Sequence, residues 1–294
     1  MRRKHHGPSP RVLSASVAAT ISIGGPWEIE ADMELVYTVI LGVVQGLAEF
    51  LPISSSGHIV VVGTLLHALT GETLPSLETT NIVLHFGTLV AIFVVFWHRV
   101  WRLAGEDRRV IGLLAVGTAP VVVTGLIVKY RFGFVFEEPI FTGCMLIVTG
   151  GMLIWASRFQ SGKVSYVDMS YRQTFTIGLF QAVAVLPGIS RSGSTIAAGL
   201  YVGLRRDAAA TFSFLLAIPA IGLAIGAGIL DLISAGPDSN SLLAFAVGAG
   251  VSFGVGLLSL LWLLQWLQKG RLRDFAFWCI PMGILVIVWQ LTAR

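Results

Sequence analysis

Polar residues in the stretch 45–58 carry the side chains that could do chemistry in this chain. The stretch reads Gln-Gly-Leu-Ala-Glu-Phe-Leu-Pro-Ile-Ser-Ser-Ser-Gly-His, which places Glu49, Ser55 and His58 close together in the sequence. A hydroxyl, a carboxylate and an imidazole in one segment suit nucleophilic or acid–base catalysis. Apolar runs flank the stretch, and a carboxylate at membrane depth is costly unless it is paired or bound to a metal. We therefore expect these three residues to be functional.

Two serine-rich breaks interrupt apolar sequence, and each is suited to bind an anion. Each opens a new helix, whose free backbone N–H groups and positive dipole end attract negative charge. The second break adds Arg191, whose planar guanidinium matches two phosphate oxygens at once. Two such breaks facing each other would form a site for more than one phosphate group. We expect the substrate to be bound there by Gln45, Ser54, Ser56, Ser190, Ser192, Gly193 and Thr195.

Glu49 lies just before the first break, and Gln45 lies one turn earlier on the same helix face. The Glu49 carboxylate could coordinate a divalent cation, Mg²⁺ or Ca²⁺, that bridges to phosphate, or it could act as a base. His58 lies a few residues beyond the break, within reach of acid–base or nucleophilic chemistry. The sequence leaves these roles open.

Each of these side chains also has a simpler interpretation. Serines at a helix start are commonly N-caps, Arg191 could be the structural partner of Glu49, and His58 could bond a backbone carbonyl. His85, in the segment 82–97, is either a core residue or a neighbour of the site. The pairing of two polar breaks, one in each half of the chain, favours the functional interpretation.

The composition indicates a helical membrane protein with many spans. Of the 294 residues 55% are hydrophobic and 12% charged, whereas soluble domains average about a quarter charged residues. The net charge of +4 does not indicate nucleic-acid binding, because most Lys and Arg lie in short clusters between apolar blocks, where they set topology and contact lipid headgroups. The two cysteines lie in apolar segments and are expected to be buried, and the eight Trp are expected to face the membrane.

Segment lengths predict six transmembrane helices and two re-entrant helical hairpins. The segments 57–69 and 194–204 are shorter than the roughly 20 residues that a span needs. Each follows a Pro- and Gly-containing break, so we expect the hairpins 35–69 and 173–204 to enter and leave the membrane on one side. The six full spans are predicted at 82–97, 110–128, 140–156, 211–230, 242–267 and 275–292.

The two halves of the chain form an internal repeat. Residues 41–57 aligned with 177–193 give seven identities in seventeen positions, and such repeats are typical of transporter-like membrane folds. We expect a first repeat at 34–160 and a second at 170–294, each with a hairpin and three spans. An odd number of crossings per half makes the second repeat inverted. Residues 1–33 are expected to be a disordered tail, with Met33 as an alternative start of the protein.

The distribution of positive charge predicts the orientation. Lys and Arg concentrate in the loops 98–109 and 157–172, just after the second hairpin and between the last two spans. By the positive-inside rule these segments face the cytoplasm. The first hairpin then enters from outside and the second from inside. Their tips are expected to meet near the midplane.

Three stretches carry a resemblance to a known family. Residues 45–58 resemble the first signature of the undecaprenyl-diphosphate phosphatase family, the bacitracin-resistance type. Residues 186–195, Leu-Pro-Gly-Ile-Ser-Arg-Ser-Gly-Ser-Thr, are similar to its second signature, and Phe-Ser-Phe-Leu-Leu-Ala-Ile-Pro at 212–219 resembles a further family stretch. The similarity runs from about Met33 to the C-terminus.

This resemblance implies an enzyme of the bacterial inner membrane that hydrolyses undecaprenyl diphosphate to undecaprenyl phosphate and phosphate. It implies a role in recycling the lipid carrier for peptidoglycan synthesis and in bacitracin resistance, with the active site open to the periplasmic side. The catalytic roles it implies fall on Glu49, Ser55, His58 and Arg191, with a divalent cation at Glu49. The chain departs from the family at Gln45, where some members have Glu. A homodimer stays open.

Several alternatives remain at this point. The attacking group could be Ser55, His58 or a water activated by Glu49; we favour Ser55 with His58 as acid–base group. A prenyl-phosphate transporter or flippase could share the inverted-repeat architecture. The type-2 phosphatidic-acid phosphatases have similar elements, but they need a His-x3-Asp motif, and no histidine follows His98. A binding protein without activity is disfavoured by the retention of the charged site residues.

Overall fold

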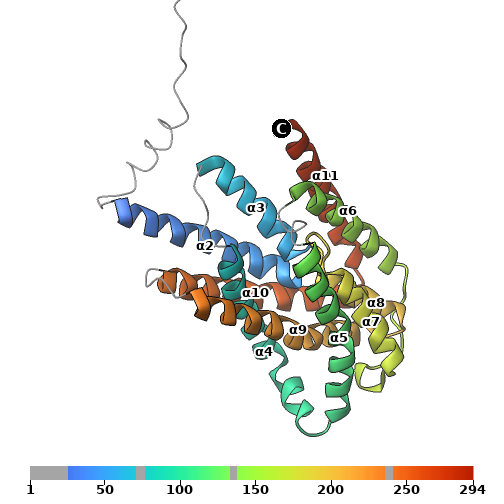
Figure 1. The fold of residues 1–294 in the computed structure, drawn as a ribbon. Coiled ribbons are helices and arrows are strands. Elements are labelled where there is room, and N and C mark those ends of the chain that lie inside the picture. The colour runs from blue at the N-terminus through green and yellow to red at the C-terminus, as the bar shows by residue number, and fades with distance from the viewer. Residues whose placement is uncertain (1–25, 71–76, 133–137, 236–240, 294) are drawn as a thin grey trace, which may run out of the picture.

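The computed structural model describes residues 26–70, 77–132, 138–235 and 241–293. These residues fold into ten α-helices and two short 3₁₀ helices, and their β-structure is limited to one isolated bridge (Figure 1). The predicted tail lies mostly outside the described residues, and the first described helix begins at Pro26. The elements are α2 (Pro26–Phe50), α3 (Ser55–Thr70), α4 (Leu77–Leu103), α5 (Arg108–Arg131), α6 (Pro139–Ala156), η2 (Tyr166–Asp168), α7 (Tyr171–Val183), α8 (Arg191–Tyr201), α9 (Arg206–Ala235), α10 (Ser241–Gln268), η3 (Leu272–Phe275) and α11 (Ala276–Ala293).

Seven helical segments in the described part of the chain are long and apolar enough to cross a membrane. Six of them match the predicted spans, which confirms a polytopic helical membrane protein. The seventh, Met33–Phe50, is the first arm of the predicted hairpin 35–69. Because this arm is long enough to cross alone, the re-entrant form of the hairpins stays a prediction.

The main helix contacts join the first half of the chain to the second. The repeat pairs α2 with α7, α3 with α8, α4 with α9, α5 with α10, and α6 with α11. Helix α2 packs on α10, and its counterpart α7 packs on α5; α4 packs on α9, and α6 on α11. Exchanging the two halves maps these four contacts onto one another, but the extensive contact of α4 with α10 has only a weaker counterpart in α5 with α9. The inverted repeat therefore stays a prediction.

Aligned glycines let the helices of each half approach closely. A β-carbon added at Gly42 of α2 would lie 3.1 Å from the carbonyl oxygen of Gly248 on α10. At the aligned Gly178 of α7 it would lie 2.7 Å from the carbonyl oxygen of Gly117 on α5. Small residues of this kind bring helix backbones together in membrane proteins. The glycines thus set the position of α2 and α7, which end at the two breaks.

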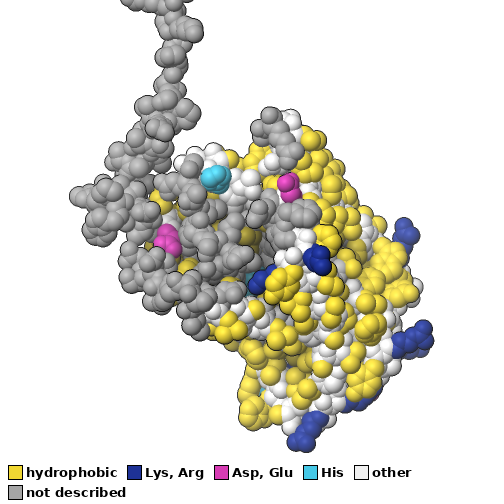
Figure 2. Space-filling view, viewed as in Figure 1, with side chains coloured by type: hydrophobic (Ala, Val, Ile, Leu, Met, Phe, Trp, Pro, Cys, Tyr) yellow, Lys and Arg dark blue, Asp and Glu magenta, His cyan; other side chains and the backbone are white. Residues whose placement is uncertain are grey.

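The surface agrees with an environment of lipid. Figure 2 shows a broad hydrophobic band on one face, with several Lys and Arg side chains at its lower and right margins. Both cysteines are free: Cys279 is buried as expected, whereas Cys144 is exposed on α6. The expectation for Cys144 was wrong because an apolar segment in a membrane can place a small side chain on its outer face.

Candidate active site

The first break, between α2 and α3, turns at Ser54. This residue has a φ of 72°, in the left-handed region that non-glycine residues rarely adopt and that recurs at functional sites. Its hydroxyl accepts a hydrogen bond from the backbone N–H of Gly57 over 3.3 Å and lies 3.4 Å from the hydroxyl of Ser56. Ser54 therefore caps α3 and leaves Ser55 at the first helical position.

The second break, between α7 and α8, also ends in a capping serine, but its left-handed residue is a glycine two positions before the cap. Gly188 turns the chain with a φ of 94°. Ser190 caps α8, because its hydroxyl accepts a hydrogen bond from the backbone N–H of Gly193 over 3.1 Å. Thr149 of α6 holds this turn: its hydroxyl donates to the carbonyl of Gly188 (2.7 Å) and accepts from the N–H of Ser190 (3.1 Å).

The two breaks lie in direct contact. A β-carbon added at Gly57 would lie 3.0 Å from the Cα of Gly188, and one added at Gly193 would lie 3.1 Å from the Cβ of Pro52. A side chain larger than glycine at either position would push the breaks apart. The structure therefore brings the N-termini of α3 and α8 to one place, where both attract negative charge.

Glu49 is the centre of a buried hydrogen-bonded cluster at this place. Its Oε1 atom accepts from Nη2 of Arg191 over 2.5 Å. Its Oε2 atom accepts from the hydroxyl of Ser55 over 2.7 Å and from the amide of Gln45 over 3.0 Å. The carboxylate is 5% exposed, so an ionised Glu49 depends on these donors. Arg191 comes from the other half of the chain, and the cluster thus joins the two repeats.

His85 of α4 lies next to this cluster. The sequence left open whether His85 is a core residue or a neighbour of the site. Its Nε2 atom lies 3.6 Å from Oε2 of Glu49. Its Nδ1 atom lies 2.7 Å from the carbonyl oxygen of Asn81, and a carbonyl can only accept, so Nδ1 carries the proton of this hydrogen bond. The ring is therefore held with Nε2 directed at the carboxylate.

Ser213 of α9 supports the second break, and we did not predict it as a site residue. Its hydroxyl lies 2.6 Å from the hydroxyl of Thr195, and its carbonyl accepts from Arg191 over 3.5 Å. Ser213 lies in the stretch 212–219, which contributed only to the family resemblance. A serine between two phenylalanines in an apolar span was the available signal.

His58 is hydrogen-bonded away from Glu49. Its Nδ1 atom donates to the carbonyl of Ser54 over 2.8 Å, and its Nε2 atom accepts from the indole N–H of Trp278 over 2.9 Å. The two partners fix a neutral ring with the proton on Nδ1. We had assigned Trp278 only to the membrane-facing aromatic residues. To act as a base, His58 must first separate from Trp278.

Comparison with known proteins identifies the family. The family model described as "Bacitracin resistance protein BacA" matches residues 38–285. The chain belongs to the BacA family. The predicted resemblance is thus confirmed over most of the chain.

Curated relatives of this BacA-family chain carry one activity in their names. An undecaprenyl-diphosphatase of Rhodopirellula baltica is 51% identical over 259 residues, which cover 88% of this chain and 99% of the relative. One from Methanosphaera stadtmanae is 38% identical over 282 residues, covering 87% and 98%. One from Halothermothrix orenii is 37% identical over 262 residues, covering 87% and 98%. These are near full-length similarities.

The predicted site residues of this BacA-family chain fall into three groups. Gln45, Glu49, Ser55 and Arg191 form the hydrogen-bonded cluster, and His58 stands apart with Trp278. The remaining predicted residues lie within the two breaks or one turn beyond them, namely Ser54, Ser56, Ser190, Ser192, Gly193 and Thr195.

The residues at the cluster offer few ligands to a divalent cation. The part of the chain that the structure describes has no group of three or more His, Cys, Asp or Glu side chains arranged to hold a metal. Glu49 is the one carboxylate of the cluster. The Oε1 atom of Gln45 is buried without a hydrogen-bond partner, and it could supply a second oxygen ligand. Mg²⁺ is often held by one or two carboxylates together with substrate phosphates, and this donor set fits such an ion.

Proposed function

We propose that this chain hydrolyses undecaprenyl diphosphate to undecaprenyl phosphate and inorganic phosphate. The observation that carries the proposal is the hydroxyl of Ser55, 2.7 Å from the Glu49 carboxylate, at the point where the N-termini of α3 and α8 meet. A nucleophile beside a base, facing two anion-attracting helix ends, suits transfer of a phosphoryl group. The names of the full-length relatives support the choice of substrate.

The second half of the site would bind the diphosphate. Arg191 uses one nitrogen for Glu49 and a second for the carbonyl of Ser213, and its remaining N–H donors are available to phosphate oxygens. Further donors are the backbone N–H groups in the first turns of α3 and α8 that do not bond to the capping serines. Together they would stabilise the charge that spreads over the phosphoryl oxygens in the transition state.

Ser55 is the nucleophile that the geometry favours, with Glu49 as its base. Glu49 accepts the hydroxyl proton while the Ser55 oxygen attacks the terminal phosphorus. The bond from that phosphorus to the bridging oxygen breaks, and undecaprenyl phosphate leaves. Water then attacks the phosphorus of the phosphoserine while Glu49 returns its proton to the departing Ser55 oxygen. Phosphate and one proton are released, and the hydroxyl and the carboxylate are restored. This proposal replaces the preference for His58 as the base, because His58 is bonded to Trp278 and Ser54.

A divalent cation is part of the proposal. The Glu49 carboxylate and the side-chain Oε1 atom of Gln45 would hold the cation, with phosphate oxygens as further ligands. When bound, it supplies positive charge that neutralises the diphosphate. Arg191 is already paired to the single carboxylate of Glu49. We therefore expect the Arg191 guanidinium, rather than the metal ion, to neutralise a large share of the diphosphate charge.

The chain is an integral membrane protein, and we propose the bacterial inner membrane as its location. The basic loops would face the cytoplasm under the positive-inside rule, which opens the first break toward the periplasmic side. The prenyl chain would lie in lipid. A homodimer stays a prediction. A transporter is not favoured, since transport needs no hydroxyl activated by a buried carboxylate.

Phosphate release from undecaprenyl diphosphate by the purified protein in detergent tests the proposal. We expect loss of activity in Glu49→Gln, which removes the base, and in Arg191→Ala, which removes the guanidinium that donates hydrogen bonds to phosphate oxygens. Glu106→Gln and Arg205→Ala are matched controls, because both residues are exposed on the Lys- and Arg-rich loops that are predicted to face the cytoplasm. Unchanged activity in both site variants would overturn the proposed site, and no release by the wild type would overturn the function.

A further inference from the structure

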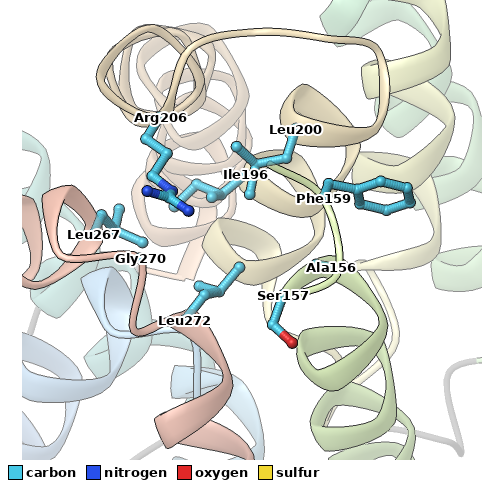
Figure 3. A pocket seen from close by; sticks show the side chains of 9 residues that line it. All are labelled: Ala156, Ser157, Phe159, Ile196, Leu200, Arg206, Leu267, Gly270 and Leu272. Atoms are coloured by element: carbon cyan, nitrogen blue, oxygen red, sulfur yellow. The ribbon is translucent and has the colours of Figure 1, made fainter. Parts of the chain in front are cut away.

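Arg206 is the first residue of α9 and follows Arg205 in one of the segments predicted to face the cytoplasm. Its side chain borders two neighbouring hollows. Figure 3 shows it reaching from the start of α9 toward Gly270, with Leu267 beside it. The smaller hollow has a volume of only about 10 Å³, and Ile196, Leu200 and Leu272 line it together with Arg206. The other has a volume of about 160 Å³. Neither hollow includes a residue of the Glu49 cluster.

No side chain in the described part of the chain neutralises the positive charge of Arg206. Among the residues that the structure describes, its guanidinium has no hydrogen bond and no ion pair; only its backbone N–H is bonded, to the hydroxyl of Ser161. The adjacent Asp207 also lines the larger hollow, but Arg205 holds its carboxylate with contacts of 3.1 and 2.6 Å. Asp274 of η3 is bonded to Arg271 over 2.6 Å. An anion from outside the chain is therefore the missing partner.

The backbone makes room for the Arg206 guanidinium. Gly270 has a φ of 72°, and a β-carbon there would lie 2.9 Å from Cζ of Arg206. The guanidinium therefore packs directly against the backbone of the turn after α10. This contact holds the group at the mouth of the hollows without using any of its N–H donors. A partly buried arginine with free donors is poised to bind an oxyanion.

The walls of the larger hollow indicate the kind of anion. Its neutral polar residues are Thr211 and Gln268, both able to donate a hydrogen bond, and its apolar residues include Phe96, Leu264 and Leu267. A guanidinium fits phosphate, and the apolar walls fit a hydrocarbon chain. Free phosphate would leave these walls exposed to water. The combination matches a phosphate group that carries an acyl or prenyl chain.

We propose that Arg206 and the larger hollow bind the phosphate headgroup of an anionic membrane lipid, separately from the catalytic site. The position at the end of the span Arg206–Leu230 is where lipid headgroups lie.

Native mass spectrometry of the detergent-solubilised full chain tests this proposal with defined lipids. The probes are phosphatidylglycerol, a diacylglycerol with the same acyl chains, and inorganic phosphate. We expect the wild type to retain phosphatidylglycerol, and Arg206→Gln to bind it about tenfold to a hundredfold more weakly, as loss of charge-assisted hydrogen bonds predicts. Arg172→Gln is the matched control, because it removes the same charge at an exposed position that lines neither hollow.

The outcomes separate the specific site from general attraction. Equal weakening in Arg172→Gln and Arg206→Gln, or no weakening in Arg206→Gln, overturns the proposal. Equal binding of diacylglycerol excludes recognition of phosphate, and binding of inorganic phosphate that phosphatidylglycerol does not displace excludes a lipid. Arg206→Lys keeps the charge but loses the planar guanidinium, so we expect its affinity for phosphatidylglycerol to lie between those of the wild type and Arg206→Gln. This variant tests the proposal if Arg206→Gln folds poorly. Because lipid retention needs no catalysis, the result is independent of the proposed function.

Discussion

Replacing Gln45 by Glu is expected to make activity depend strongly on a divalent cation. In the wild type the Gln45 amide donates to Oε2 of Glu49 over 3.0 Å, and Gln45 is completely buried. The substitution removes this donor and places a second carboxylate at the same separation. Two like charges about 3 Å apart repel by about 5 kcal/mol at an effective dielectric constant of about 20. Such a pair needs a cation or a shared proton between the carboxylates.

The wild type and the variant should therefore respond differently to a chelator. In the wild type Arg191 already balances the single charge of Glu49. In Gln45→Glu one carboxylate is left over, and a cation that offsets even a third of the repulsion changes activity about tenfold. We expect a chelator to reduce the activity of the variant at least about tenfold more than that of the wild type.

The assay is phosphate release from undecaprenyl diphosphate across a titration of Mg²⁺ and of Ca²⁺ after chelation. Gln45→Leu is the control, because it removes the amide donor and adds no charge; it should lose activity without gaining cation dependence. Size-exclusion profiles establish that each variant is folded. A folded Gln45→Glu protein with the cation dependence of the wild type would refute the role assigned to the Gln45–Glu49 pair.

The remaining predictions concern the nucleophile, its neighbour and the helix packing. Ser55→Ala should reduce activity at least about a thousandfold and abolish a phosphoserine trapped by acid quench and found by mass spectrometry; a phosphorylated residue elsewhere would contradict the scheme. Trp278→Phe removes one hydrogen bond to His58 (2.9 Å); because Glu49 and not His58 is the proposed base, kcat should stay within about threefold of the wild type, and a larger change in either direction would contradict that assignment. Gly46→Ala would place a methyl group 2.8 Å from the backbone nitrogen of Gly256 and should lower the free energy of unfolding by about 1–3 kcal/mol, seen as a lower Tm. Gly254→Ala, with open space around it, should leave Tm unchanged, and equal shifts in both variants would argue against the close packing of α2 and α10.

Much of the architecture could be predicted because it depends on properties that repeat along the chain. Apolar segments of membrane-spanning length gave the six spans, and the Pro- and Ser-containing breaks gave the ends of α2 and α7. The cap at Ser190 and the matching hydrogen bond at Ser54 follow from local residue types. The repeat was predicted from identities at aligned positions, and the contact of α2 with α10 has its counterpart in that of α7 with α5.

The contacts of the site could not be predicted, because they join residues from distant parts of the chain. The sequence offered both a phosphate role and a structural role for Arg191, and only the fold shows its bond to Glu49, 142 positions away. His85 was undecided until the packing of α4 placed its Nε2 atom 3.6 Å from the carboxylate. No local pattern encodes such distances, since they result from many helix contacts together.

The sequence by itself determined which residues could do chemistry, where the helices break and that the two halves correspond. These features depend on residue type and on spacing along one segment. The tertiary structure decided the partners: Ser55 on Glu49, His58 on Trp278 at 220 positions' distance, and Arg206 beside the turn at Gly270. Partners are fixed by how the helices pack, and that packing depends on weak contacts spread over the whole membrane-embedded fold.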